Sequence, residues 1–439
     1  MTPECYLLRL PPEVLFIIME NVAPPIGSLS SSNDMPTVFA LRQTCRLLRT
    51  CVDSLTLWIH DKFSVERLLH WLGMVELPFD AVRVRDRGIR FLEIYSGDQD
   101  LMRRIGERNS WEFRSVVALE AASIYVPSFA EHVNAISLTE FYDPADVNLA
   151  IHRLSKCANL VDLEIIFDAW NVTVLSLDLI ADCCLGLKRL KIWFLSEWKG
   201  SLKTLRNLKS YELVTSDKEH EDDLLPVASA DSLEYLNLSW WSLDNDAVVL
   251  TSRLTNATLP AFTALTTLRI EPLCNSDCRL LIDSNIRLST FHTSIKKDDI
   301  EETRVSYSLL DDILTCACLS KVRRLTLLIE RGHFGADDHR FIVETIIRRM
   351  DRTVEELTLG LGISVGWCYQ LRYLRSLRSL YWIAAESELT VTAGTDGGDV
   401  SQELAVILRR AFEHRVLVTA QVIPDEDYAE LWSEYLSLL

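Results

Sequence analysis

The sequence lacks any apolar run that approaches the roughly 20 residues that a membrane-spanning helix needs. Even the stretch VVALEAASIYV is interrupted by Glu120. The N-terminal residues MTPECYLLRLPPEV contain charge and proline where a signal peptide would have an uninterrupted apolar stretch. These absences predict a soluble protein that stays in a reducing compartment, in the cytoplasm, the nucleus or both.

Long runs of basic residues are also missing. Lysine and arginine occur at most in pairs, such as Arg103-Arg104 and Arg348-Arg349, and the chain carries a formal net charge of -18. A surface with this charge repels nucleic acid and anionic lipid. We therefore expect neither nucleic acid nor a membrane among the partners.

The sequence contains no repeated CxxC pair and no His-x3-5-His motif, the spacings typical of zinc sites. Its 11 cysteines include three close pairs, Cys183-Cys184, Cys274-x3-Cys278 and Cys316-x-Cys318, and its nine histidines are scattered singly. We expect no metal and no cofactor.

At 439 residues and 48% apolar content, the chain is long enough to bury a large core. Its first 60 residues predict three short helices. The first follows Leu10-Pro11-Pro12-Glu13 and extends to about Val22, because proline suits a helix start. A loop rich in proline, serine and glycine covers 23–36; the stripe Val38, Leu41, Cys45 and Leu48 marks the second helix, and a third approaches Leu57-Trp58.

These three segments resemble the F-box, which has a leucine-proline-x-glutamate opening, a central cysteine-arginine stretch and a closing leucine-tryptophan. The matching residues are Leu10, Pro11, Glu13, Leu15, Leu41, Cys45, Arg46, Val52, Asp53 and Trp58. The resemblance implies docking onto a Skp-type adaptor and, through it, onto a cullin. The adaptor-binding residues that it implies are Leu10, Pro11, Glu13, Leu15, Leu41, Cys45 and Trp58. An ordinary three-helix cap on the following repeats is the alternative.

From about residue 85 the chain repeats a strand pattern, apolar-x-x-apolar-x-apolar, in copies that start 21 to 34 residues apart. Much of this spacing matches leucine-rich repeats. Weaker copies start at Ile89, Phe113 and Val133. The clear copies start at Leu160, Leu187, Leu208, Leu233, Leu265, Leu288, Val322, Val354 and Leu377.

Helical spacing lies between several copies, over 300–319 and 341–350 and in VLSLDLIADCC after Leu160. Strand plus helix at one period predicts an α/β solenoid, with curved, mostly parallel strands inside and helices outside. We expect a docking module over 1–62, a connecting helix and irregular repeat over 63–110, the repeats over 111–423 and a capping helix over 424–439. A doubly wound α/β sheet is the alternative fold.

Alternation along each strand should send the leucines inward and the x positions to a concave, partner-binding face. The residues expected there are Asp162, Glu164, Arg189, Lys191, Glu212, Tyr235, Asn237, Arg269, Arg324, Glu356 and Tyr381. Tryptophans at the strand ends could fill the core or anchor a partner. They are Trp170, Trp193, Trp198, Trp240 and Trp241.

Gly362-Ile363-Ser364-Val365-Gly366 matches the G-x-S-x-G motif of serine hydrolases. A hydrolase would need Asp396 or Asp399 and His414 beside Ser364, and the sequence has no HGGG-like oxyanion loop. We therefore expect a non-catalytic chain, and the F-box resemblance implies that it is the substrate-recognition subunit of a Skp-cullin-F-box ubiquitin ligase. A leucine-rich scaffold without a ligase is the main alternative, and a hydrolase using Ser364 is a remote one.

The last residues predict an amphipathic helix with Asp425 at its start, since Tyr428, Leu431, Trp432 and Tyr435 fall at steps of three and one. The apolar edge of a final repeat needs a cover. We expect residues 425–439 to pack on the repeat around Leu377.

Overall fold

The computed structural model describes the chain between residues 109 and 423, apart from 114–115, 127, 140–143, 168–173, 196, 216–223, 241–258, 296–304, 330–335, 361–369, 386–411 and 413–414. The chain divides into two compact units, Met1–Gly200 and Ser201–Leu439. The predicted docking helices, the connecting segment up to residue 108 and the predicted C-terminal helix lie outside the described residues.

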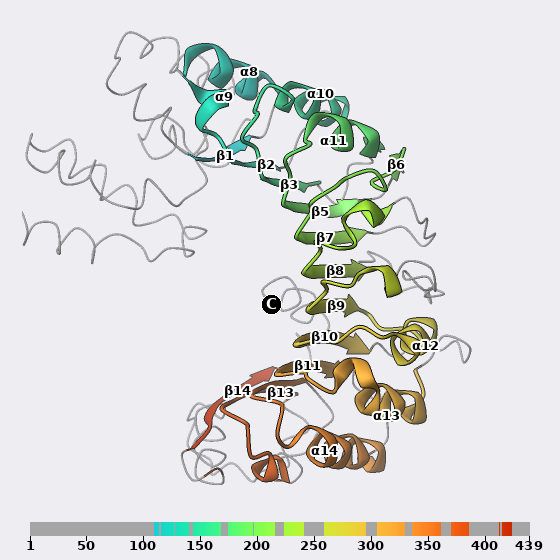
Figure 1. The fold of residues 1–439 in the computed structure, drawn as a ribbon. Coiled ribbons are helices and arrows are strands. Elements are labelled where there is room, and N and C mark those ends of the chain that lie inside the picture. Colours follow the sequence, from blue (N-terminus) through green and yellow to red (C-terminus); the bar gives the residue numbers. More distant parts are fainter. Residues whose placement is uncertain are drawn as a thin grey trace, which may run out of the picture. The chain divides into compact units, whose positions relative to one another are not determined.

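The described part of the first unit has four parallel strands in the order β1-β2-β3-β5, and a small separate pair, β4 with β6. Helices α8 to α11 lie on one side of these strands (Figure 1). The elements are β1 (Ser110–Phe113), α8 (Val116–Tyr125), α9 (Phe129–His132), β2 (Ala135–Thr139), α10 (Pro144–Leu154), β3 (Asp162–Ile166), β4 (Val174–Ser176), α11 (Leu177–Cys183), β5 (Arg189–Leu195) and β6 (Glu197–Lys199).

The described part of the second unit has eight parallel strands, and each pairs with the next along the chain. Its strands are β7 (Ser210–Thr215), β8 (Tyr235–Trp240), β9 (Thr267–Glu271), β10 (Thr290–Ile295), β11 (Arg324–Ile329), β12 (Glu356–Gly360), β13 (Ser379–Ala385) and β14 (Leu417–Ile423). Its helices and 3-10 turns are η3 (Val227–Ser229), η4 (Leu259–Ala261), α12 (Asn275–Asp283), α13 (Tyr307–Thr315), η5 (Ala317–Leu319), α14 (Ala336–Met350) and η6 (Leu371–Tyr373).

The repeated apolar pattern determines where the strands form. All nine clear copies become strands, β3, β5 and β7 to β13, and each strand starts two residues after the first apolar residue of its copy. In the first copy Leu160 and Leu163 are 2% and 0% exposed, and in the Leu265 copy Leu268 and Ile270 are both 0% exposed. Burying one such side chain stabilises the fold by about 1.5–3 kcal/mol. The aligned leucines therefore form a continuous core row within each unit.

Several links between strands contain a helix in the part that the structure describes, as between β10 and β11 and between β11 and β12. Helix α14 buries Ile342, Val343 and Ile346 and leaves Phe341 46% exposed, which places one apolar stripe toward the core. Helix α13 begins after Ser306, whose hydroxyl accepts a hydrogen bond from the Leu309 amide at 3.3 Å. The helical segments expected over 300–319 and 341–350 are confirmed in their described parts by α13 and α14. In VLSLDLIADCC, α11 confirms the helix from Leu177 on, but Val174–Ser176 form strand β4, so the expected helix is wrong there.

The strand order follows the chain within each unit, without the reversal of a doubly wound sheet. The α/β class with parallel strands and helices is therefore confirmed for the described residues, and the doubly wound alternative is wrong for them. The weak copy at Val133 becomes β2, but the copy at Phe113 is wrong, because β1 ends there and α8 begins at Val116. Trp111 stacks on Phe113 at 5.7 Å between ring centroids, and this pair fixes the earlier strand position.

Candidate partner-binding face

Side chains at the first, third and fifth positions of the parallel strands point away from the leucine core, and we call them the strand face. In β3 these are Asp162, Glu164 and Ile166, and the register places Arg189 and Lys191 of β5 directly beside Asp162 and Glu164. Neighbouring strands lie about 4.8 Å apart, so side chains in one row contact each other laterally. The expected alternation is confirmed by the buried leucines between these positions.

Exposure differs among the eleven residues expected on this face. Arg189, Arg324 and Glu356 are exposed, and Asp162, Lys191, Glu212, Tyr235 and Tyr381 are half-buried. Glu164, Asn237 and Arg269 lie on this face as expected but are largely covered, because they are only 9%, 3% and 7% exposed. All three occupy the third strand position, in the middle row of the face, where other side chains flank them on both sides.

In the first unit, charges pair across neighbouring strands. Arg189 lies 3.3 Å from Asp162, and Lys191 Nζ lies 3.0 Å from Glu164 Oε1. The Ser137 hydroxyl donates to Glu164 Oε2 at 2.5 Å, so this carboxylate binds both of its neighbouring strands. Lys191 Nζ also lies 3.6 Å from the centroid of the Trp193 ring, a cation–π contact.

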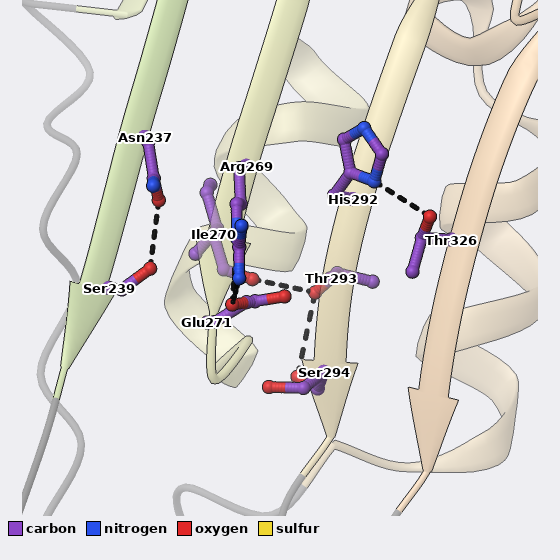
Figure 2. Close-up of polar contacts among 9 residues, drawn as sticks. All are labelled: Asn237, Ser239, Arg269, Ile270, Glu271, His292, Thr293, Ser294 and Thr326. Atoms are coloured by element: carbon purple, nitrogen blue, oxygen red, sulfur yellow. Dashed lines mark hydrogen bonds and ion pairs between the residues drawn. The ribbon is translucent and has the colours of Figure 1, made fainter. Parts of the chain in front are cut away.

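In the second unit, one ion pair runs along a strand. Arg269 Nε and Nη2 each lie 2.8 Å from Glu271 Oε2, and the two side chains are 8% and 3% exposed (Figure 2). Both residues belong to β9. Because residues two apart along a strand lie on the same face, both are part of the strand face. Because the guanidinium and carboxylate neutralise each other in place, they can remain almost completely buried.

Next to this pair, His292 of β10 shares a hydrogen bond with Thr326 of β11, at 2.7 Å between Nδ1 and Oγ1 (Figure 2). Burial lowers the pKa of His292 to about 4, with further lowering by the charges of Arg269 and Arg324. The imidazole is therefore neutral at pH 7. On β8, the Ser239 hydroxyl donates to Asn237 Oδ1 at 2.8 Å.

Tyrosine adds a neutral hydroxyl to the face at β8. Burial, with a further contribution from the charge of Glu212, raises the pKa of Tyr235 to about 12. Together with Asn237 and His292, it gives the middle of the face uncharged groups that can both donate and accept hydrogen bonds.

The edge of the face at the strand starts is exposed and charged. Arg324 of β11 lies 3.0 Å from Glu356 of β12. Immediately before β11, β12 and β13 begin, Glu355 lies 4.0 Å from Arg323 and 3.6 Å from Arg378. These pairs again join neighbouring strands, and they leave alternating charges accessible to a partner.

Several residues of the site were not anticipated from the sequence, among them Glu271, His292 and Thr326. Glu271 falls beyond the six-residue pattern, while His292 and Thr326 sit at its third variable position in the copies LSTFHT and VRRLTL. The register of the clear copies, extended by one strand position, is the signal that would have found them.

Other predicted site residues are only partly placed. Trp193 and Trp198 are half-buried. The adaptor-binding residues Leu10, Pro11, Glu13, Leu15, Leu41, Cys45 and Trp58 lie outside the described residues, as do Trp170, Trp241 and the hydrolase candidates Ser364, Asp396, Asp399 and His414.

Among the described residues no group of three or more histidine, cysteine, aspartate or glutamate side chains is arranged to hold a metal ion. Within the same residues, no helix combines the length and apolarity needed to cross a bilayer. No protein-family model matches the sequence, and no curated protein is significantly similar to it.

Proposed function

We propose that this chain is the substrate-recognition subunit of a Skp-cullin-F-box ubiquitin ligase, and that its strands form a divergent leucine-rich-repeat solenoid whose strand face binds the target protein. One observation carries the recognition half of this proposal. A row of polar side chains crosses consecutive parallel strands, from Glu212 on β7 to Tyr381 on β13, opposite a continuous buried leucine row.

The size of this face suits a protein ligand. Eight strands at about 4.8 Å spacing extend over roughly 34 Å, more than a small molecule occupies. Its middle groups are held by lateral hydrogen bonds, such as His292 to Thr326, so little side-chain entropy is lost when a partner binds. Exposed charges at Arg324 and Glu356 supply the polar rim that is common around interface centres.

The ligase half of the proposal rests on the F-box resemblance of Leu10, Pro11, Glu13, Leu15, Leu41, Cys45 and Trp58. Apolar side chains of such a module bind in a preformed groove of the adaptor. Ubiquitin transfer is then catalysed elsewhere in the assembly, and this chain supplies no reacting group.

The adaptor test uses the full chain and a purified Skp-type adaptor. We expect a stable complex by gel filtration and calorimetry, and we expect Leu10→Asp with Leu15→Asp to abolish it. The matched control is Leu185→Asp, because Leu185 is 74% exposed on the described surface and lies outside the docking segment. If the wild-type chain does not bind the adaptor, the ligase proposal is wrong and the scaffold alternative remains.

The target test compares exposed arginines on and off the strand face. After crosslinking in cells, Arg324→Glu should reduce the recovery of the main target severalfold, while Arg279→Glu, on the exposed side of α12, should not. Adaptor binding should be the same in both variants. Equal target recovery from the two variants would place target binding away from this part of the strand face.

A further inference from the structure

Two cysteines lie in direct contact in the segment that connects α13 to β11. Cys316 follows the last residue of α13 and Cys318 lies in η5, and their sulfur atoms are 2.8 Å apart. A disulfide bond is about 2.05 Å long, so the two sulfur atoms need to approach by less than about 1 Å to form one.

The two thiols differ in accessibility. Cys316 is half-buried, whereas Cys318 is 0% exposed. A dissolved oxidant can therefore reach Cys316 first, while Cys318 lies behind it. This asymmetry is the arrangement of a reacting thiol with a resolving thiol.

The electrostatics agree with this assignment. The Cys318 thiol hydrogen-bonds to Cys316 and lowers the pKa of Cys316 below its ordinary value, and the same contact raises the pKa of Cys318. The thiolate is the nucleophilic form of cysteine, so Cys316 is the more reactive of the two at neutral pH.

We propose that Cys316 and Cys318 form a hydroperoxide-sensitive dithiol, in which Cys316 is oxidised first and Cys318 then closes an intramolecular disulfide. This site does not depend on the proposed ligase function. It makes the turn before β11 a point where oxidants act on the protein.

The reaction balances in two steps. The Cys316 thiolate attacks one peroxide oxygen, the O–O bond breaks, and water or an alcohol leaves while Cys316 becomes a sulfenic acid. Cys318 then attacks the Cys316 sulfur; the S–S bond forms, the S–O bond breaks, and the hydroxyl group leaves as water with the Cys318 proton. The two thiols lose two electrons, and the hydroperoxide is reduced by the same two.

The other close pairs lack this combination. Cys274 and Cys278 are both buried, and the Cys274 thiol donates a hydrogen bond to Asp277 Oδ2 at 3.1 Å. Burial is the largest cause that raises the pKa of each of them, and burial likewise raises those of Cys183 and Cys184. Cys274 and Cys278 therefore serve as an internal control.

The test treats the folded full chain with increasing hydrogen peroxide, then denatures it, alkylates all free thiols and digests with trypsin. Cleavage after Arg304 and Lys321 gives a peptide whose only cysteines are Cys316 and Cys318, and cleavage after Arg269 and Arg279 gives one with Cys274 and Cys278. We expect the first peptide to escape alkylation and to lose the mass of two hydrogen atoms at doses that leave the second fully alkylated. Equal oxidation of both peptides, or none of the first, would overturn the proposal.

Two variants test the order of the steps. In Cys318→Ser, peroxide should convert Cys316 to a sulfenic acid that a dione reagent traps; in Cys316→Ser, Cys318 should remain a thiol at the same dose. The reverse pattern would contradict the assigned roles. The pH midpoint for alkylation of Cys316 should also be lower in the wild type than in Cys318→Ser, and the wild-type digest stands by itself if a variant fails to fold.

Discussion

Charges on the strand face are paired in two different ways, across neighbouring strands in both units and along one strand in β9 of the second unit. In the first unit they pair across strands, Arg189 with Asp162 and Lys191 with Glu164, and at least one partner of each pair remains accessible to water. In β9 of the second unit, Arg269 and Glu271 pair along a single strand and are almost fully buried.

This difference shows two uses of charge in one architecture. A pair between strands favours their register, because a slip of one strand would no longer place the two opposite charges beside each other. A pair within one strand adds nothing to register, but it neutralises two charges so that they can lie beneath the surface of the face. Removing one member should therefore cost little in the first arrangement and much in the second.

The largest effect is expected from Arg269→Met, which removes the guanidinium beside the buried Glu271 carboxylate in β9. We expect the free energy of unfolding to fall by about 3–5 kcal/mol, measured by urea denaturation of the full chain. The double variant Arg269→Met with Glu271→Leu should recover most of this loss, because no buried charge remains. A single variant within about 1 kcal/mol of the wild type would contradict the comparison.

Acid should destabilise the second unit through His292. Its folded pKa of about 4 lies below its ordinary value of 6.5, so the unfolded chain binds the additional proton between these pH values. The neutral imidazole contributes up to about 3 kcal/mol to the free energy of unfolding above pH 6.5, and this contribution is lost as the pH falls toward 4. The variant His292→Gln should lack this part of the pH dependence, and parallel stability curves for the two proteins would show that the imidazole is not held neutral.

A smaller effect is expected in the first unit from Lys191→Met. The change removes the pair with Glu164, in which the Lys191 side chain is 28% exposed and that of Glu164 11%, but keeps an unbranched side chain against Trp193. Because Glu164 still accepts from Ser137, we expect a loss of only about 1 kcal/mol in chemical denaturation. Glu164→Gln is the matched change on the other partner. A loss as large as that of Arg269→Met would remove the distinction between pairs across strands and pairs along one strand.

The smallest effect is expected from Arg324→Gln, since Arg324 and Glu356 are 61% and 51% exposed. A double-mutant cycle with Glu356→Gln should give a coupling of about 0.5 kcal/mol or less that decreases further in high salt. The same substitution should raise the pKa of His292, measured by NMR titration, because it removes one of the two nearby positive charges. A salt-independent coupling above about 1 kcal/mol would show that this pair is shielded from solvent.

The sequence by itself determined where the nine clear strands form and which side of each faces the core. Copies such as LVDLEI and LTTLRI carry both kinds of information, because the apolar residues that must be buried recur with the strand's own period of two. The pattern was wrong at Phe113, where packing of Trp111 and Phe113 against Phe129 places the strand earlier. It also missed β14, which pairs with β13 and has Arg415 at the position where the clear copies begin with an apolar residue.

Only the tertiary structure decided which polar residues of the strand face are buried and which partners they have. Arg269 and Arg324 both occupy variable positions of the repeated pattern. Arg269 is nevertheless 7% exposed beside Glu271, whereas Arg324 is exposed beside Glu356. The contact between His292 and Thr326 joins residues 34 positions apart, and it depends on the register of β10 with β11. Burial and lateral pairing depend on neighbours that the assembled strands bring together, so no local pattern of residues can specify them.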